Sequence, residues 1–109
     1  WASNLKDLNG DNVRVEFATS SVSSPGLEYY LNIPAASAPT YEAGIVGLIE
    51  NLQYCNLRDR GFMTITFTAN EAKAQWHYVD TILSDVFQEI TSRSASASVN
   101  AGDNQLTLS

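Results

Sequence analysis

The chain has 109 residues, the size of one compact domain, and its 44% hydrophobic content argues against disorder through most of its length. Six Lys or Arg residues against twelve Asp or Glu residues give a net charge of −6. Nonspecific nucleic-acid binding needs clustered cations, so we expect no nucleic-acid partner. No apolar run approaches membrane-spanning length, so no membrane span is predicted.

The first third of the chain predicts one strand and one loop. Residues 13–17 alternate apolar and polar side chains behind a turn cluster at 9–12, which is typical of a half-buried strand. Residues 19–26 are small and polar, end in Pro-Gly, and predict a loop. Residues 27–32 fit either one helical turn or a short strand, and the stretch between Pro34 and Pro39 suggests no regular element.

One amphipathic helix is predicted from Thr40, which is a plausible N-cap. The apolar side chains of one face recur at helical spacing: Tyr41, Ile45, Leu48 and Leu52. Gly44 and Gly47 lower the helix propensity by about 1 kcal/mol each relative to alanine. We therefore expect the helix to lie on a tertiary surface, or its glycines to permit close packing.

The middle of the chain predicts an antiparallel hairpin. A charged turn at 56–61 precedes a strand at 62–68, and a turn at 70–71 leads into a second strand at 72–79. The aromatic and β-branched side chains of these two strands should form the main core contact.

The last third is less regular. Residues 80–90 fit either a helix or a continuation of the preceding strand, and the Ser-Ala stretch 92–98 has little to bury. A turn at 100–104 precedes a short strand at 105–108. We predict an α+β fold with mainly antiparallel strands and one amphipathic helix, with residues 1–109 forming a single domain or the C-terminal piece of a larger one.

The isolated candidates for catalysis have no evident partners. His77 lies on the polar face of its strand and Asp80 would point to the opposite face, so a surface or structurally bonded histidine is the favoured interpretation. Cys55 has no second cysteine and no neighbouring base, which favours a buried small hydrophobe. No spacing typical of a metal site or a phosphate-binding glycine loop is present.

The turn Arg58-Asp59-Arg60 is the one candidate for anion binding, since guanidinium groups bind oxyanions with two parallel hydrogen bonds. The alternative, favoured because charge runs usually mark solvated faces, is an exposed ion cluster. From the residues alone, the chain is a globular segment without its own catalytic set.

Five segments resemble, in order, the C-terminal part of PhoD-type alkaline phosphatases and phosphodiesterases. They are Trp-Ala-Ser at 1–3, Val-Glu-Phe leading into Ser-Ser-Pro-Gly at 15–26, Asn-Leu-Arg-Asp-Arg-Gly-Phe at 56–62, Trp-His-Tyr-Val-Asp-Thr-Ile at 76–82 and Asn-Ala-Gly-Asp-Asn-Gln-Leu at 100–106. The likeness covers nearly the whole chain. One departure is Glu50-Asn51, where relatives tend to have Pro-His, so the role of that histidine is not carried over to Asn51.

This resemblance implies a periplasmic or secreted phosphoesterase built on the calcineurin-like metallophosphatase sandwich, in which divalent or ferric ions activate water. In that family a late ligand motif, Gly-Asp-Xaa-His, precedes a Trp-Ala step similar to Trp1-Ala2. The chain would then begin after the last metal ligand and hold no metal and no catalytic residue itself. Its partner would be the upstream catalytic part of the parent chain. Arg60, in the arginine-glycine-aromatic turn, is the candidate for substrate binding.

Two other hypotheses compete with this one. The chain could be a noncatalytic antiparallel module that binds a ligand or protein through an aromatic patch: Tyr29, Tyr30, Trp76 and Tyr78. A small enzyme using Arg60, His77 and Cys55 ranks last. A piece cut from a sandwich would leave apolar surface and strand edges uncovered, so we also expect homo-oligomers.

Overall fold

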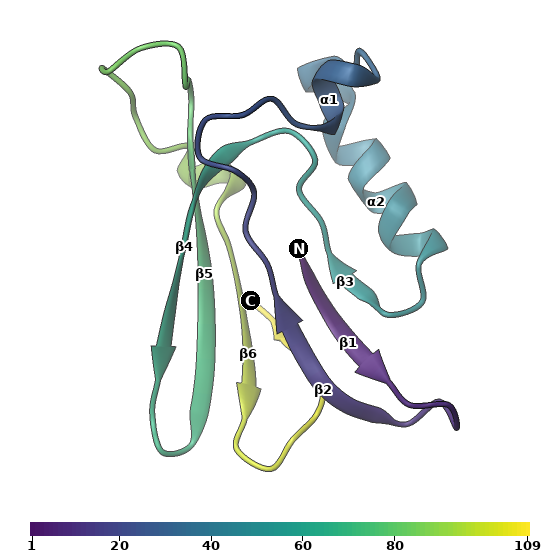
Figure 1. The fold of residues 1–109 in the computed structure, drawn as a ribbon. Coiled ribbons are helices and arrows are strands. Elements are labelled where there is room, and N and C mark those ends of the chain that lie inside the picture. Colours follow the sequence, from purple (N-terminus) through teal and green to yellow (C-terminus); the bar gives the residue numbers. More distant parts are fainter.

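The computed structural model describes residues 1–109 as two antiparallel sheets with helices along one flank (Figure 1). The three-stranded sheet has the order β2-β1-β3 and contains β1 (Ala2–Lys6), β2 (Asn12–Phe17) and β3 (Leu52–Tyr54). The four-stranded sheet has the order β4-β5-β6-β7 and contains β4 (Arg60–Phe67), β5 (Glu71–Val79), β6 (Ala95–Asn100) and β7 (Thr107–Leu108). The predicted α+β class with mainly antiparallel strands is confirmed.

Four short helical elements complete the fold: α1 (Leu27–Tyr30), the 3₁₀ helix η1 (Ala35–Ser37), α2 (Ala38–Leu48) and the 3₁₀ helix η2 (Thr91–Arg93). Helix α2 begins two residues before the predicted start, and Ser37 rather than Thr40 occupies its N-cap position. Pro39 lies in the first turn, where a missing N–H costs no helical hydrogen bond. None of these helices is long and apolar enough to cross a membrane.

The apolar stripe predicted for α2 does not face the core. Tyr41 and Leu48 are exposed, and Leu52 is buried but belongs to β3. The buried side chains of the helix are instead Ala38 and Glu42. The helix therefore docks through a face that carries a carboxylate, and ion pairing rather than apolar packing decides which face turns inward.

The core lies between the two sheets and contains three fully buried alanines beside two aromatic side chains: Ala2, Ala74, Ala97, Trp76 and Tyr78, with Leu106 at its margin. Trp76 contacts the rings of Phe17 and Tyr54, with ring centroids 6.1 and 4.9 Å apart. Its Nε1 donates to the carbonyl of Ala18 at 2.8 Å. Because alanine projects only one carbon, the backbones of the two sheets come close around this indole.

The predicted hairpin is confirmed, with Arg60 opposite Val79 and Phe67 opposite Ala72 across β4 and β5. The predicted core face of β5 is buried from Ala74 to Tyr78 at alternate positions. Strand β4 is an edge strand, and its apolar side chains are largely exposed towards the hairpin end, with Phe67 75% exposed. The main core contact therefore comes from β5 and not equally from both strands.

Two expectations for the last third are wrong. Residues 80–90 form neither a helix nor a strand extension but an irregular loop, which returns to β5 through Asp80 N–H to Gln88 O at 3.0 Å and Ile90 N–H to Tyr78 O at 2.7 Å. The Ser-Ala stretch contributes to strand β6, where Ala97 pairs with Ala74 and both are fully buried. Small side chains here fill the core because the facing sheet is close.

Candidate functional site

Three consecutive charged residues, Arg58, Asp59 and Arg60, span the end of the turn and the first residue of β4. The Asn56 side-chain oxygen accepts hydrogen bonds from the backbone N–H groups of Arg58 and Asp59 at 3.1 and 2.8 Å, which fixes the turn. Asp59 and Arg60 are buried, with 8% and 6% of their surface exposed. The interpretation of this segment as an exposed ion cluster is therefore wrong for two of its three residues.

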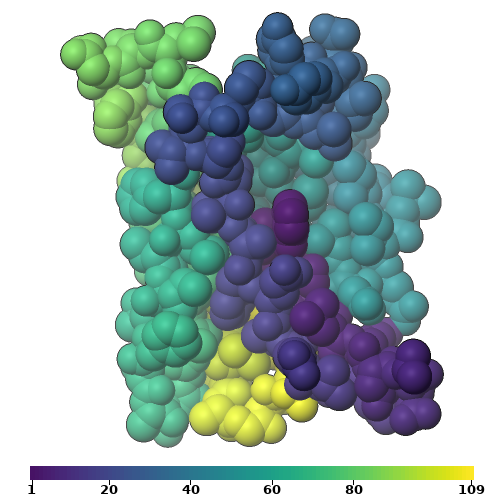
Figure 2. Space-filling view, viewed as in Figure 1, coloured from purple at the N-terminus to yellow at the C-terminus, as the bar shows by residue number.

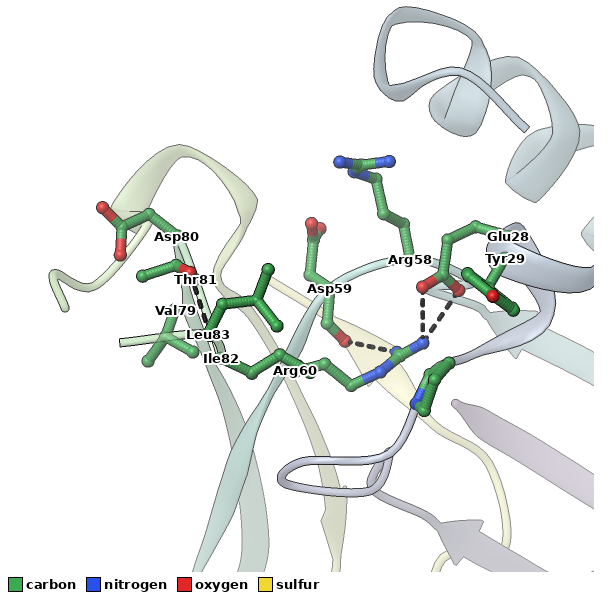
Figure 3. A pocket seen from close by; sticks show the side chains of 11 residues that line it. Glu28, Tyr29, Arg58, Asp59, Arg60, Val79, Asp80, Thr81, Ile82 and Leu83 are labelled. Carbon is green, nitrogen blue, oxygen red and sulfur yellow. Dashed lines mark hydrogen bonds and ion pairs between the residues drawn. The ribbon is translucent and has the colours of Figure 1, made fainter. Parts of the chain in front are cut away.

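The Arg60 guanidinium binds α1 and the loop before it (Figure 3). Its Nη2 donates to both carboxylate oxygens of Glu28 at 2.8 Å, and its Nε donates to the carbonyl of Ser24 at 2.7 Å. Its Nη1 donates to the carbonyl of Asp59 at 3.0 Å. These bonds fasten the 19–26 loop and α1 to the start of β4. Most N–H donors of the Arg60 guanidinium already have acceptors within the chain. Substrate binding by Arg60 stays a prediction.

A second arginine, Arg93 of η2, joins the turn to α2. Its Nη2 donates to both oxygens of Glu42 at 2.7 and 2.8 Å, and its Nε donates to Asp59 Oδ2 at 2.6 Å. Burial lowers the pKa of Arg93, but the hydrogen bonds and charges of the two carboxylates outweigh burial and raise it above its usual value. No local sequence pattern predicts this network, because Arg93 and Glu42 lie 51 residues apart.

A cleft of about 380 Å³ opens where the turn meets the loop after β5. It is lined by Pro25, Glu28, Tyr29 and the segments 58–60 and 79–83. In Figure 2 the 80–90 loop, in green, and the segment containing α1, in blue, project separately at this end of the molecule. A second cavity of the same volume adjoins it and shares Glu28, Tyr29 and Arg58 with the first.

His77 and Cys55 lie outside this cleft. His77 Nδ1 lies 2.8 Å from Glu89 Oε1, and its ring stacks on Phe62 with centroids 4.8 Å apart, as expected of a structurally bonded histidine. The hydrogen bond from His77 lowers the pKa of Glu89. Cys55 is half-buried, and burial raises the pKa of its thiol. The contacts of Arg60, His77 and Cys55 share no residue, so the structure does not assemble them into one site.

The predicted aromatic patch does not exist as one surface. Trp76 and Tyr78 are 1% and 3% exposed and belong to the core, whereas Tyr29 and Tyr30 are 68% and 71% exposed on α1. The Tyr78 hydroxyl lies 2.8 Å from that of Tyr54. Alternation along β5 placed both aromatic residues on the apolar face, and that face is the buried one.

Asn51 has a structural contact. Its backbone carbonyl accepts the N–H of Asn4 at 2.8 Å beside β1, while its side-chain oxygen is buried without a hydrogen-bond partner. The residue is only partly buried overall. This position therefore helps to join β1 to the segment before β3.

No three His, Cys, Asp or Glu side chains converge closely enough to hold a metal ion. The carboxylates nearest the turn are each paired with a guanidinium: Glu28 with Arg60, and Glu42 and Asp59 with Arg93. A carboxylate that is neutralised in this way is a poor ligand for a hard cation.

Comparison with known families gives one match. Residues 1–76 match the family described as PhoD-like phosphatase, which is 76 of the 109 residues. The matched segment runs from β1 through the turn at 56–59 and along β5 as far as Trp76. No curated protein and no solved structure matches the chain significantly.

Proposed function

Because the chain belongs to the PhoD-like phosphatase family, we propose that it forms the C-terminal structural part of a metal-dependent phosphoesterase. The metal ligands and catalytic groups would come from polypeptide upstream of Trp1. The parent enzyme would hydrolyse phosphate monoesters or diesters with divalent or ferric ions, in the periplasm or outside the cell. Its fold would be the calcineurin-like metallophosphatase sandwich.

The observation that carries this proposal is the extent of the family match relative to the core. The matched residues supply β1, β2 and β3 of one sheet and the buried Trp76 of the other, so the family pattern includes both sides of the packed interface. The remaining strands, β6 and β7, extend the second sheet. A two-sheet wall of this kind can support a neighbouring catalytic centre without contributing ligands to it.

The flank formed by α1 and α2 supplies a surface for the upstream part. Its exposed apolar side chains are Tyr29, Tyr30, Leu31, Tyr41, Leu48 and Ile49. A patch of exposed apolar groups of this kind is typical of surfaces that other protein segments cover. In the proposed parent enzyme this flank packs against the catalytic part. In the chain by itself the same flank, or the free edges of β2 and β4, would favour self-association.

Hydrolysis assays test the proposal directly. The purified chain should not hydrolyse a chromogenic phosphate monoester or diester with added Ca²⁺, Mn²⁺, Zn²⁺ or Fe³⁺. Metal-dependent hydrolysis above a heat-denatured control would overturn the proposal. The reading frame provides a second test, because the gene should encode a long upstream segment with Asp and His ligand motifs, including Gly-Asp-Xaa-His. A gene without such a segment would also contradict the proposal.

A further inference from the structure

We propose that Arg58, together with the hydroxyl of Tyr29, binds the oxyanion of a phosphate ester at the junction of the two cavities described above. This inference deepens the proposed function and rests on it for the choice of ligand. It concerns Arg58, the neighbour of Arg60, for which substrate binding stays a separate prediction.

The argument starts from the two guanidinium groups of the turn. The Arg60 guanidinium is buried and bonded to Glu28, Ser24 and the Asp59 carbonyl. Arg58 is only partly buried, and its guanidinium makes no hydrogen bond or ion pair within the chain. In Figure 3 it stands apart from the Arg60–Glu28 pair and carries no dashed line. Arg58 is therefore the guanidinium that remains available to an external anion.

The position of Arg58 is fixed by structure that surrounds it. Its backbone N–H is bonded to Asn56, and the next residue, Asp59, is held by Arg93 and Asn56. Because residues 59 and 60 are both anchored, the turn cannot readily collapse over the cleft. A cation on a rigid support loses less conformational freedom on binding an anion than one on a mobile loop.

The overlap of the two cavities limits the number of residues that could bind an anion at their junction. Three residues line both cavities: Glu28, Tyr29 and Arg58. The Glu28 carboxylate is already paired with Arg60, so the polar side chains without a partner among these three residues are Arg58 and Tyr29. Both groups donate hydrogen bonds. A tetrahedral phosphate ester offers several acceptor oxygens, so it can accept from both donors at once.

The charge distribution places the anion at this junction and not deeper in the first cavity. Asp80, whose carboxylate accepts the N–H of Gln88, lines the first cavity only. Figure 3 shows Asp80 on the opposite side of the cleft from Arg58. Repulsion by this carboxylate favours an anion on the Arg58 side.

The test is an NMR titration of the purified chain with phenyl phosphate in the presence of EDTA. We expect saturable shifts of the amide signals of residues 29, 58 and 59. Arg58→Gln should weaken binding about tenfold, and Tyr29→Phe should weaken it about threefold. Arg14→Gln, which removes an exposed arginine of β2, should leave the affinity unchanged.

Each other outcome is informative. Inorganic phosphate should compete for the same signals, whereas equal competition by acetate would indicate a general carboxylate site and would overturn the assignment. Absence of saturable shifts, or equal affinity of Arg58→Gln and the parent chain, would also overturn it. Release of phenol is a separate readout, because hydrolysis would contradict the proposed noncatalytic role and not the assignment of Arg58.

Discussion

Arg93 binds Glu42 through both carboxylate oxygens, at 2.7 and 2.8 Å, and so connects the end of the 80–90 loop to helix α2. The same carboxylate accepts the backbone N–H of Leu57 at 2.9 Å. Glu42 therefore satisfies donors from two segments that are distant in sequence. The pair explains why α2 buries a charged residue while Tyr41 and Leu48 remain exposed.

Replacing Glu42 with glutamine tests this explanation. Glutamine keeps the shape of the side chain but has one acceptor oxygen for donors that now use two, and it removes the charge opposite Arg93. We expect the free energy of unfolding to fall by about 2 kcal/mol, below the range for fully buried pairs because the Arg93 side chain is 26% exposed. Urea denaturation measures this loss without screening charges.

Glu50→Gln is the matched control for that variant. Glu50 pairs with Lys6, but its side chain is 81% exposed, so the change should leave the free energy of unfolding close to that of the parent chain. Equal denaturation midpoints for the two variants would show that the Glu42–Arg93 pair does not stabilise the fold.

The three core alanines provide a second prediction. Ala97 is fully buried opposite Ala74, where the two sheets approach each other. Leucine at position 97 would have to displace β1 or Trp76, and we expect the free energy of unfolding to fall by about 3 kcal/mol. Ala43→Leu, on the exposed side of α2, should change stability by less than about 0.5 kcal/mol. Unchanged stability of Ala97→Leu would mean that the core has room for a larger side chain at position 97.

The strands that the sequence predicts are those with large apolar side chains at alternate positions, whether or not the fold buries them. Strand β5 alternates alanine and aromatic residues with polar ones, so its period is visible. Strand β1 buries Ala2, Ser3 and Asn4, and β6 buries Ala97, so neither strand has a large apolar side chain in the core. A strand whose only apolar core side chain is an alanine has almost no hydrophobic period, and its pairing depends on neighbours that are distant in sequence.

In the candidate site, too, local features could be predicted from the sequence and long-range contacts could not. The turn containing Arg58 and Arg60 could be selected from sequence, because charged residues beside a strand start are a local feature. The hydrogen-bond acceptors that distinguish the two arginines could not be identified from the sequence. Glu28 lies 32 residues from Arg60, and nothing local indicates that it neutralises one guanidinium and leaves the other free. Only the tertiary arrangement separates a structural arginine from one that is available to a ligand.

Gly26, which lies beside the Arg60–Glu28 ion pair, provides a third prediction. A Cβ atom at this position would overlap the Arg60 guanidinium and the Glu28 carboxylate. Gly26→Ala must therefore displace the buried ion pair, and we expect a loss of about 2 kcal/mol in unfolding free energy. Gly44→Ala has open space around it and removes a glycine from α2, so it should stabilise the chain by about 0.5–1 kcal/mol. Thermal unfolding of both variants checks the opposite signs.

The hydrogen-bonded hydroxyls of Tyr54 and Tyr78 predict how stability depends on alkaline pH. Burial raises the pKa of both phenols, and the bond to Tyr54 raises that of Tyr78 further. Below the unfolded pKa of about 10, both states keep the phenolic proton and stability is unaffected. Above it, the unfolded chain ionises Tyr78 while the folded chain does not, so the unfolding free energy falls with rising pH, by up to about 1.4 kcal/mol per pH unit for this group.

Urea denaturation between pH 8 and roughly 11 measures this slope, because this pH range brackets the pKa of tyrosine in the unfolded chain. Tyr78→Phe should reduce the slope, because phenylalanine has no proton to lose in either state. Tyr41→Phe, which changes a tyrosine that is 52% exposed on α2, should leave the slope close to that of the parent chain.

The bond between the two hydroxyls also predicts that Tyr78→Phe lowers stability near neutral pH by about 1 kcal/mol, since it leaves the half-buried Tyr54 hydroxyl without this partner. An unchanged alkaline slope in Tyr78→Phe would show that this phenol ionises equally in the folded and unfolded chain, which its position in the core between the sheets should prevent.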